Sequence, residues 1–171
     1  MIQRQCTFVK RFKTRCPLYT DIGIVRTRMP EYRFVKIGQG AFRTVYAVTG
    51  LRLVVKFPIS KRRPGFRLTF FHGRNEYEAV CTVLREPKLA PLRRYMPEIY
   101  FHEAGVTVMK RYRPALWTDE FDGFSDTFDD LVSDLKFHLK QWNLDTGVDN
   151  FGRENGQYIF LDTGVLGYAK R

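Results

Sequence analysis

The segment from Asn143 to Gly164 has the sequence NLDTGVDNFGRENGQYIFLDTG, and it decides how the rest of the chain is interpreted. It contains two Asp-Thr-Gly turns, which begin at Asp145 and Asp162, and Asn150 follows the first Asp by five residues. Two carboxylates in separate turns, with an amide between them, are oxygen donors that suit a hard cation such as Mg²⁺. Asp, Asn and Gly also form ordinary turns very often, so the spacing alone leaves both interpretations open.

Length and composition indicate one folded domain, which can consist of two small lobes. The chain has 171 residues, of which 44% are hydrophobic and 15% aromatic, enough for a real core. The N-terminus lacks the apolar stretch of a signal peptide, and no window approaches the length of a membrane span. The three cysteines form no CxxC pair, which fits a reducing compartment. We therefore expect a cytoplasmic protein that does not contact a membrane.

Charge is distributed unevenly along the chain. Residues 1–117 contain 24 Lys and Arg against 7 Asp and Glu, whereas residues 118–171 contain 5 against 11, which together give the net charge of +11. The basic part has the charge to attract phosphates, nucleic acid or an acidic protein partner. A solubilising surface is the alternative, and a charge excess alone does not decide between them.

Apolar periodicity predicts an order of strands and helices. The predicted strands occupy residues 7–12, 21–30, 32–38, 43–48 and 51–58, and two more fall within 96–114 on either side of a turn at Ala104-Gly105. A basic loop is expected over residues 60–73, because Pro64 and Gly65 break any regular helix or strand there. Helices are expected over residues 73–87 and 127–139, followed by a closing hairpin with its turn at Asn155-Gly156.

Two further features are suited to binding phosphate. The segment GQGAFRTVY follows a strand, and glycines in such a turn let main-chain N–H groups approach phosphate oxygens, although a simple tight turn is the commoner explanation. Lys56 lies among apolar neighbours on the next strand, so an inward-facing ammonium there needs an anionic partner. Glu76 is favoured over Glu78 as that partner, because Val80 and Val83 share its side of the helix. A surface Lys and Glu that never meet is the alternative.

Taken in order, these motifs resemble those of a protein kinase over residues 32–164. The resemblance implies an α+β fold with an antiparallel-sheet N-lobe, one helix and a minimal, truncated C-lobe. It also implies ATP and Mg²⁺ as cofactors. The implied catalytic groups are Lys56, Glu76 and Asp145, and the implied metal ligands are Asn150 and Asp162. The implied nucleotide-binding residues are Gly38, Gln39, Gly40, Ala41, Phe42, Val45, Val54, Lys56, the gatekeeper Met109, Lys110, Arg111 and Tyr112.

The chain also departs from the kinase pattern. Arg43 replaces the third glycine of the Gly-rich loop, which either stiffens the loop or brings another cation to the phosphates. Asn143 and Leu144 replace the His and Arg of HRD, and Thr163 replaces the Phe of DFG. Only seven residues follow Gly164, so the expected organisation is a basic extension (1–30), an N-lobe (31–111) and a minimal C-lobe (112–171). Miniature kinases of this kind resemble those encoded by bacteriophages.

The expected function is ATP- and Mg²⁺-dependent phosphorylation of hydroxyl side chains, Ser/Thr more than Tyr, on proteins of a bacterial host. The host cytoplasm is then the expected location. The first alternative is a kinase-like binding protein that inhibits or mimics a partner. A third hypothesis is nucleic-acid binding through the basic part, with Phe8, Phe12 and Phe66 stacking on bases; the alternative, which is preferred, is a solvated basic face with these aromatics in the core.

Overall fold

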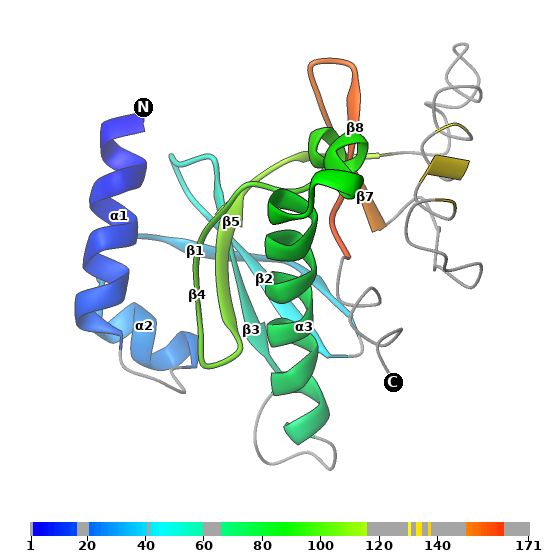
Figure 1. Cartoon of the computed structure of the whole chain (residues 1–171). Helices are drawn as coiled ribbons and strands as arrows, with labels where there is room; N and C mark the ends of the chain where they lie inside the picture. The colour runs from blue at the N-terminus through cyan, green and yellow to red at the C-terminus, as the bar shows by residue number, and fades with distance from the viewer. Residues whose placement is uncertain are drawn as a thin grey trace. The chain divides into compact units, whose positions relative to one another are not determined.

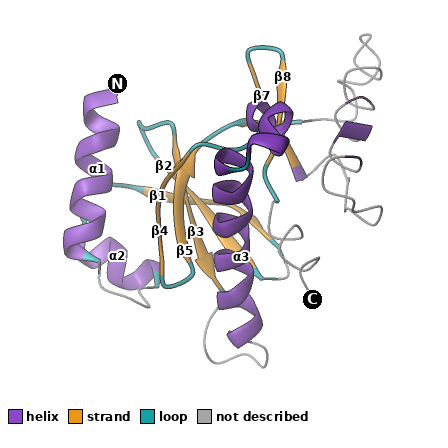
Figure 2. Cartoon of the chain, in the orientation of Figure 1, coloured by secondary structure: helices purple, strands orange, loops and turns teal. Residues whose placement is uncertain are grey.

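The computed structural model contains two antiparallel sheets among its described residues, and each sheet belongs to a different part of the chain (Figures 1 and 2). The described residues are 2–16, 21–40, 42–59, 66–115, 130, 133–134, 137 and 150–162; at 2 and 66–72 the description covers the backbone alone. One compact unit comprises Met1–Arg74 and Glu98–Arg111, and the other comprises Asn75–Pro97 and Tyr112–Arg171.

The first unit is built on a five-stranded antiparallel sheet. Its strands are β1 (Phe34–Gln39), β2 (Arg43–Val48), β3 (Leu53–Pro58), β4 (Ile99–Glu103) and β5 (Val106–Lys110), in the spatial order β1-β2-β3-β5-β4. The predicted turn between β4 and β5 is observed, with positive φ angles of 50° at Ala104 and 77° at Gly105. These five strands confirm the sequence prediction for residues 32–58 and 96–114.

The two strands predicted before residue 31 are wrong, because that segment forms helices α1 (Ile2–Arg15) and α2 (Ile22–Arg28). Phe8 and Phe12 stand one helical turn apart, and both are buried, so the 3.6-residue period prevails over a short apolar run of ambiguous pattern. Asp21 caps α2 by accepting a 3.0 Å hydrogen bond from the Ile24 N–H, a signal that was overlooked in the sequence.

Helices α1 and α2 complete the core of the first unit on one face of the sheet. The members of this core from the two helices and their flanks are Phe8, Phe12, Cys16, Val25 and Met29, and those from the strands are Phe34, Val48, Leu53, Val55, Phe57, Val106 and Val108. Residues 1–30 therefore supply apolar side chains that the sheet needs on this face.

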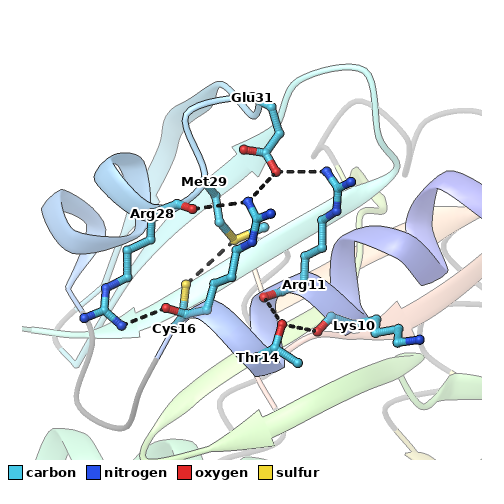
Figure 3. Close-up of polar contacts among 8 residues, drawn as sticks. Lys10, Arg11, Thr14, Cys16, Arg28, Met29 and Glu31 are labelled. Carbon is cyan, nitrogen blue, oxygen red and sulfur yellow. Dashed lines mark hydrogen bonds and ion pairs between the residues drawn. The ribbon is translucent and has the colours of Figure 1, made fainter.

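Polar contacts fix the positions of α1 and α2 at their exposed side (Figure 3). Arg11 and Arg15 each donate from Nη1 to the same oxygen of Glu31, at 3.0 Å in both cases. Arg28 donates to the main-chain carbonyl of Arg15 at 2.9 Å, and Cys16 Sγ lies 3.7 Å from Met29 Sδ. Part of the basic character of α1 is thus used within the unit.

The strand alternation of β3 separates the two faces of the sheet. Leu53, Val55 and Phe57 belong to the core beneath α1 and α2. Val54 and Lys56 therefore point to the opposite face, since successive side chains of a strand alternate. This second face thus carries two of the residues that the kinase resemblance assigns to the nucleotide.

Helix α3 (Phe66–Arg85) begins seven residues earlier than predicted and runs from the first unit into the second. The loop expected over residues 60–73 is wrong from Phe66 onward, because a single glycine, Gly73, does not stop a helix. A 3-10 helix, η1 (Pro87–Tyr95), follows α3, so the prediction of a helix ending near Pro87 is confirmed.

The second unit contains a three-stranded sheet in the order β6-β7-β8, formed by β6 (Arg113–Pro114), β7 (Phe151–Glu154) and β8 (Gln157–Phe160). The β7–β8 turn has positive φ angles at Asn155 (52°) and Gly156 (79°), so the predicted Asn-Gly hairpin is confirmed. The predicted helix at 127–139 falls mostly outside the described residues. No helix in the described ranges is long and apolar enough to cross a membrane.

These elements define a mixed α+β fold with an antiparallel N-terminal sheet and few helices. The predicted α+β fold class is therefore confirmed.

Candidate functional site

The predicted phosphate-binding lysine lies in a row of side chains on the face of the sheet opposite α1. Val45 pairs with Lys56 across β2 and β3, and Lys56 pairs with Thr107 across β3 and β5. Gly38 pairs with Val45 on the other side of the row. Directly paired residues point to the same face of a sheet, so Gly38, Val45 and Lys56 share one surface.

A second row, adjacent to the first, is apolar. Val35 pairs with Ala47, Ala47 with Val54, and Val54 with Met109. Val54 and Met109, both expected at the nucleotide, therefore share the face of Lys56. Sequence reasoning missed Val35, which is 43% exposed, and Ala47; their alternation with the core residues Phe34 and Val48 was the available signal.

The Gly-rich turn joins β1 to β2 at the edge of this face. The N–H of Gly40 donates to the Arg43 carbonyl at 2.9 Å, and the carbonyl of Phe42 accepts from Ile59 at 3.1 Å. A Cβ at Gly40 would meet nothing within 4 Å, so packing within the structure gives no reason for a glycine there. Gln39 pairs with Thr44, and Ala41 lies outside the described residues.

The segment after Met109 leads from the first unit to the second. Lys110 ends β5, and its ammonium lies 3.4 Å from Glu98 Oε2. The N–H of Lys110 donates to the Glu98 carbonyl, and that of Arg111 donates to the Arg52 carbonyl, each at 2.9 Å. Tyr112, the last residue of the expected nucleotide-binding segment, is buried. It is the first residue of the second of the two segments that form the other unit.

Glu76 lies on the buried side of α3, as the helix periodicity predicts. Its side chain is 1% exposed, and Val80 and Val83, which share its side of the helix, are 2% and 1% exposed. Glu78 is exposed. A buried carboxylate requires a charged or hydrogen-bonding partner. Lys56 belongs to the first unit and Glu76 to the second, and their ion pair stays a prediction.

The two predicted metal ligands of the second unit stand at the same end of the β7–β8 hairpin. The N–H of Leu161 donates to the Asn150 carbonyl at 2.7 Å, which places Asp162 directly after that bridge. Asn150 and Asp162 are both half-buried. The hairpin thus brings the main chain of Asn150 close to that of Asp162, twelve residues further along the sequence.

Aromatic stacking and a close backbone approach support this end of the hairpin. Phe151 and Phe160 are paired across the strands and stack with ring centroids 5.0 Å apart, and both are buried. A Cβ at Gly152 would come within 2.6 Å of Tyr112 Cβ, so only glycine fits there. The positions of Asn150 and Asp162 therefore rest on a well-packed support.

The donor chemistry of this hairpin end fits Mg²⁺. An amide oxygen and a carboxylate oxygen are the ligand types that Mg²⁺ takes from proteins, usually together with water and phosphate oxygens. Asn150 and Asp162 are the residues that would hold the ion. Asp145, the predicted third group of this set, lies outside the described residues.

Arg43 is a buried cation of the sheet face whose role sequence reasoning left open. Its side chain is 6% exposed, and Nη2 donates to Thr107 Oγ1 at 2.9 Å and to the Lys56 carbonyl at 3.2 Å. The guanidinium is therefore bonded into the sheet. The two roles considered for this residue, stiffening of the loop and contact with the phosphates, both stay predictions.

No model of a protein family matches the chain, and no curated protein matches it. Among solved structures, the chain is similar to the aminoglycoside phosphotransferase APH(2″)-IIa in its ternary complex with streptomycin and ATP, with a TM-score of 0.46 and 14% identity. The match covers 74% of this chain and 42% of that one, so the chain spans less than half of that enzyme's length.

Proposed function

We propose that the chain is an ATP- and Mg²⁺-dependent phosphotransferase of the protein-kinase-like type. The observation that supports this most directly is the hairpin that holds Asn150 and Asp162 at one end, with the Leu161–Asn150 hydrogen bond of 2.7 Å between them. A turn made only for folding requires neither an amide nor a carboxylate beyond the strand ends. Phosphoryl transfer requires both, because the charge on the triphosphate must be neutralised.

The sheet face of the first unit supplies the second line of support. Val45, Val54 and Met109 are apolar residues on the same face of the sheet as Lys56, and a purine base binds against side chains of this type. In the proposed mechanism Lys56 binds the α- and β-phosphates, and Glu76 holds the ammonium in place. Met109 and the segment from Lys110 to Tyr112 border the adenine.

The Gly-rich turn completes the nucleotide site in this proposal. The phosphates lie against the turn between β1 and β2 in this proposal, because the absence of a side chain at Gly40 leaves room for their oxygens. Asn150 and Asp162 would hold Mg²⁺, which would supply positive charge beside the phosphates. Asp145 accepts the proton of the attacking hydroxyl and orients its oxygen towards the γ-phosphorus.

The acceptor that we propose is a Ser or Thr hydroxyl on a protein of a bacterial host, as for a bacteriophage-encoded kinase acting in the host cytoplasm. A small-molecule hydroxyl requires the same groups, because only the acceptor changes. The experiment must therefore separate these acceptors.

The test is transfer of labelled γ-phosphate from ATP with Mg²⁺, using the full chain and the Asp145→Asn variant in parallel. Each is incubated alone, with a bacterial lysate, and with a panel of small-molecule alcohols that includes an aminoglycoside. Label on a protein band with the wild-type chain only supports the proposal, and label on a small molecule reassigns the acceptor. A folded wild-type chain that transfers no label would overturn the proposal and favour a kinase-like binding protein.

A further inference from the structure

A polar network joins four strands of the first unit, and it includes the main-chain carbonyl of Lys56. Arg43 Nη2 donates to the carbonyl of Lys56 at 3.2 Å and to the hydroxyl of Thr107 at 2.9 Å. That hydroxyl also lies 3.0 Å from Nδ1 of His102. Arg43 is on β2, Lys56 on β3, His102 on β4 and Thr107 on β5, so one guanidinium and one hydroxyl link the strands from β2 to β4.

The surroundings of the network limit the movement of the guanidinium. Thr107 is 0% exposed and Arg43 is 6% exposed. Gly73 of α3 lies against the guanidinium, and a Cβ there would also come within 2.9 Å of the Gly105 carbonyl. A side chain at this point of α3 would therefore occupy the space that Arg43 uses.

A strand carbonyl has two lone pairs, so the Lys56 carbonyl can accept a hydrogen bond from Arg43. Because the donor is charged, this bond is strong and helps to fix the position of the carbonyl. The Arg43 fork also reaches the residue that pairs with Lys56 across the sheet, Thr107. Together these bonds fix the main chain from which the Lys56 side chain projects. A lysine that binds a phosphate must be held accurately in position, because misplacement by about 1 Å lowers the rate by about 10²-fold.

We propose that Arg43 is a positioning residue for Lys56, and that it acts through its bonds to the Lys56 carbonyl and to Thr107. This inference rests on the proposed function, since it assigns Lys56 to the phosphates of ATP. It gives Arg43, at the position of a glycine in the kinase pattern, a role within the sheet.

The test is a double-mutant cycle on the full chain. Arg43→Met retains an unbranched apolar stem and removes every donor, and Thr107→Val removes the shared hydroxyl with little change of shape. Each is measured alone and combined with Lys56→Met. If Arg43 acts through Lys56, each substitution lowers kcat/KM for ATP by about 10- to 100-fold in the wild-type background and has an effect of less than about 2-fold without Lys56.

Two controls separate positioning from stability. Thr107→Ser retains the hydroxyl and is expected to restore kcat/KM to near the wild-type value. Thr44→Val is the matched control, because Thr44 is a strand residue next to Arg43 that pairs with the core residue Phe57 and so points to the other face. All variants are assayed at a temperature below the midpoint of their thermal unfolding, so that each is folded. If Arg43→Met does not fold, Thr107→Val still decides the question.

Losses that are equal with and without Lys56, or no loss at all, would overturn the proposal. The dissociation constant for ATP, measured by calorimetry through the same cycle, is the second readout when transfer by a Lys56→Met variant falls below detection. A wild-type chain that binds ATP without transferring phosphate overturns the proposed function but leaves the cycle on binding decisive. A wild-type chain that does not bind ATP overturns both.

Discussion

Leu161 donates its main-chain N–H to the carbonyl of Asn150 at 2.7 Å, and this bond closes the open end of the β7–β8 hairpin. Asp162 follows Leu161 directly, so the main chains of Asn150 and Asp162 lie at the same end of the hairpin. Both proposed ligands of Mg²⁺ thus come from one supersecondary element, whose turn lies at the opposite end. The hairpin is a preorganised support, so changes to its ligands should affect chemistry more than folding.

We expect Asp162→Asn to lower phosphoryl transfer by about 10²-fold or more, because the change removes a charge that holds the ion against the phosphates. The free energy of unfolding should change little, since Asp162 lies beyond the end of β8 and is half-buried. Transfer rates at increasing Mg²⁺ concentrations measure the effect. Asp134→Asn is the matched control, because Asp134 is 39% exposed and contacts Arg94 at 3.5 Å. Unchanged transfer in the Asp162 variant would remove this residue from the site.

We expect Gly73→Ala to destabilise the protein, although alanine in place of an interior helical glycine usually stabilises by about 1 kcal/mol. The new Cβ would lie 2.9 Å from the Gly105 carbonyl and against the Arg43 guanidinium. We expect a net loss of about 1–3 kcal/mol, as for other overpacked sites. Chemical denaturation measures it, with Leu84→Ala as a control on the same helix because Leu84 is 50% exposed. A stabilised Gly73→Ala variant would show that α3 does not pack against Arg43 in this way.

The N-terminal helix is expected to be essential for the stability of the first unit. Phe8 is 0% exposed and makes an edge-to-face contact with Tyr32 at 4.9 Å between ring centroids. Phe8→Ala should therefore lower the free energy of unfolding by about 3–5 kcal/mol. Lys10→Ala on the exposed side of the same helix should change it by less than about 0.5 kcal/mol. Similar unfolding curves for the two variants would mean that α1 is not part of the core.

The burial of Phe8 and Phe12 also bears on nucleic-acid binding. The two rings are 0% and 2% exposed, so the third hypothesis, that bases stack on them, is wrong for this pair, and the preferred alternative of core aromatics is confirmed for it. Phosphate contacts by the basic residues are unaffected by this correction. Their measure is the salt dependence of any affinity for nucleic acid.

We expect Glu31 to contribute to stability in a pH-dependent way. The pKa of Glu31 is lowered from its ordinary value of 4.5, first by a hydrogen bond from its own main chain and then by Arg15 and Arg11, whereas desolvation acts in the opposite direction. A lowered pKa in the folded state means that the contribution is fully present above pH 4.5 and is lost as the pH falls through the lowered value.

Unfolding measured from about pH 6 to about pH 3 tests this expectation with Glu31→Gln. The stability difference between wild type and variant should shrink as the pH falls, and added salt should shrink it at neutral pH. A difference that stays constant over this range would show that the charge of Glu31 contributes nothing through Arg11 and Arg15.

The cysteines are expected to differ in their reactivity with a thiol reagent. Cys6 is exposed, whereas Cys16 is buried beside Met29. Burial raises the pKa of the Cys16 thiol from its ordinary value of 9.0, against the opposing charges of Arg28 and Arg15. Labelling at neutral pH, mapped by mass spectrometry, should modify Cys6 at least about 10-fold faster than Cys16. Equal rates would indicate that the α1–α2 contact opens readily.

The sequence by itself determined the local structure of most of the described chain. Alternation and turn chemistry predicted the five strands of the large sheet and the two hairpins at Ala104-Gly105 and Asn155-Gly156, because these signals act between near neighbours. It also identified Glu76 as the inward carboxylate of α3, since the period of a helix fixes which residues share a face.

Only the tertiary structure decided the features that depend on distant partners. Residues 7–12 are a short apolar run that fits either period, and burial of Phe8 and Phe12 against the sheet selected the helix. The position of the Arg43 side chain depended on Thr107, 64 residues away, because a buried guanidinium requires hydrogen-bond acceptors. Local spacing specifies strands, turns and faces, whereas the choice among partners is made when the strands come together.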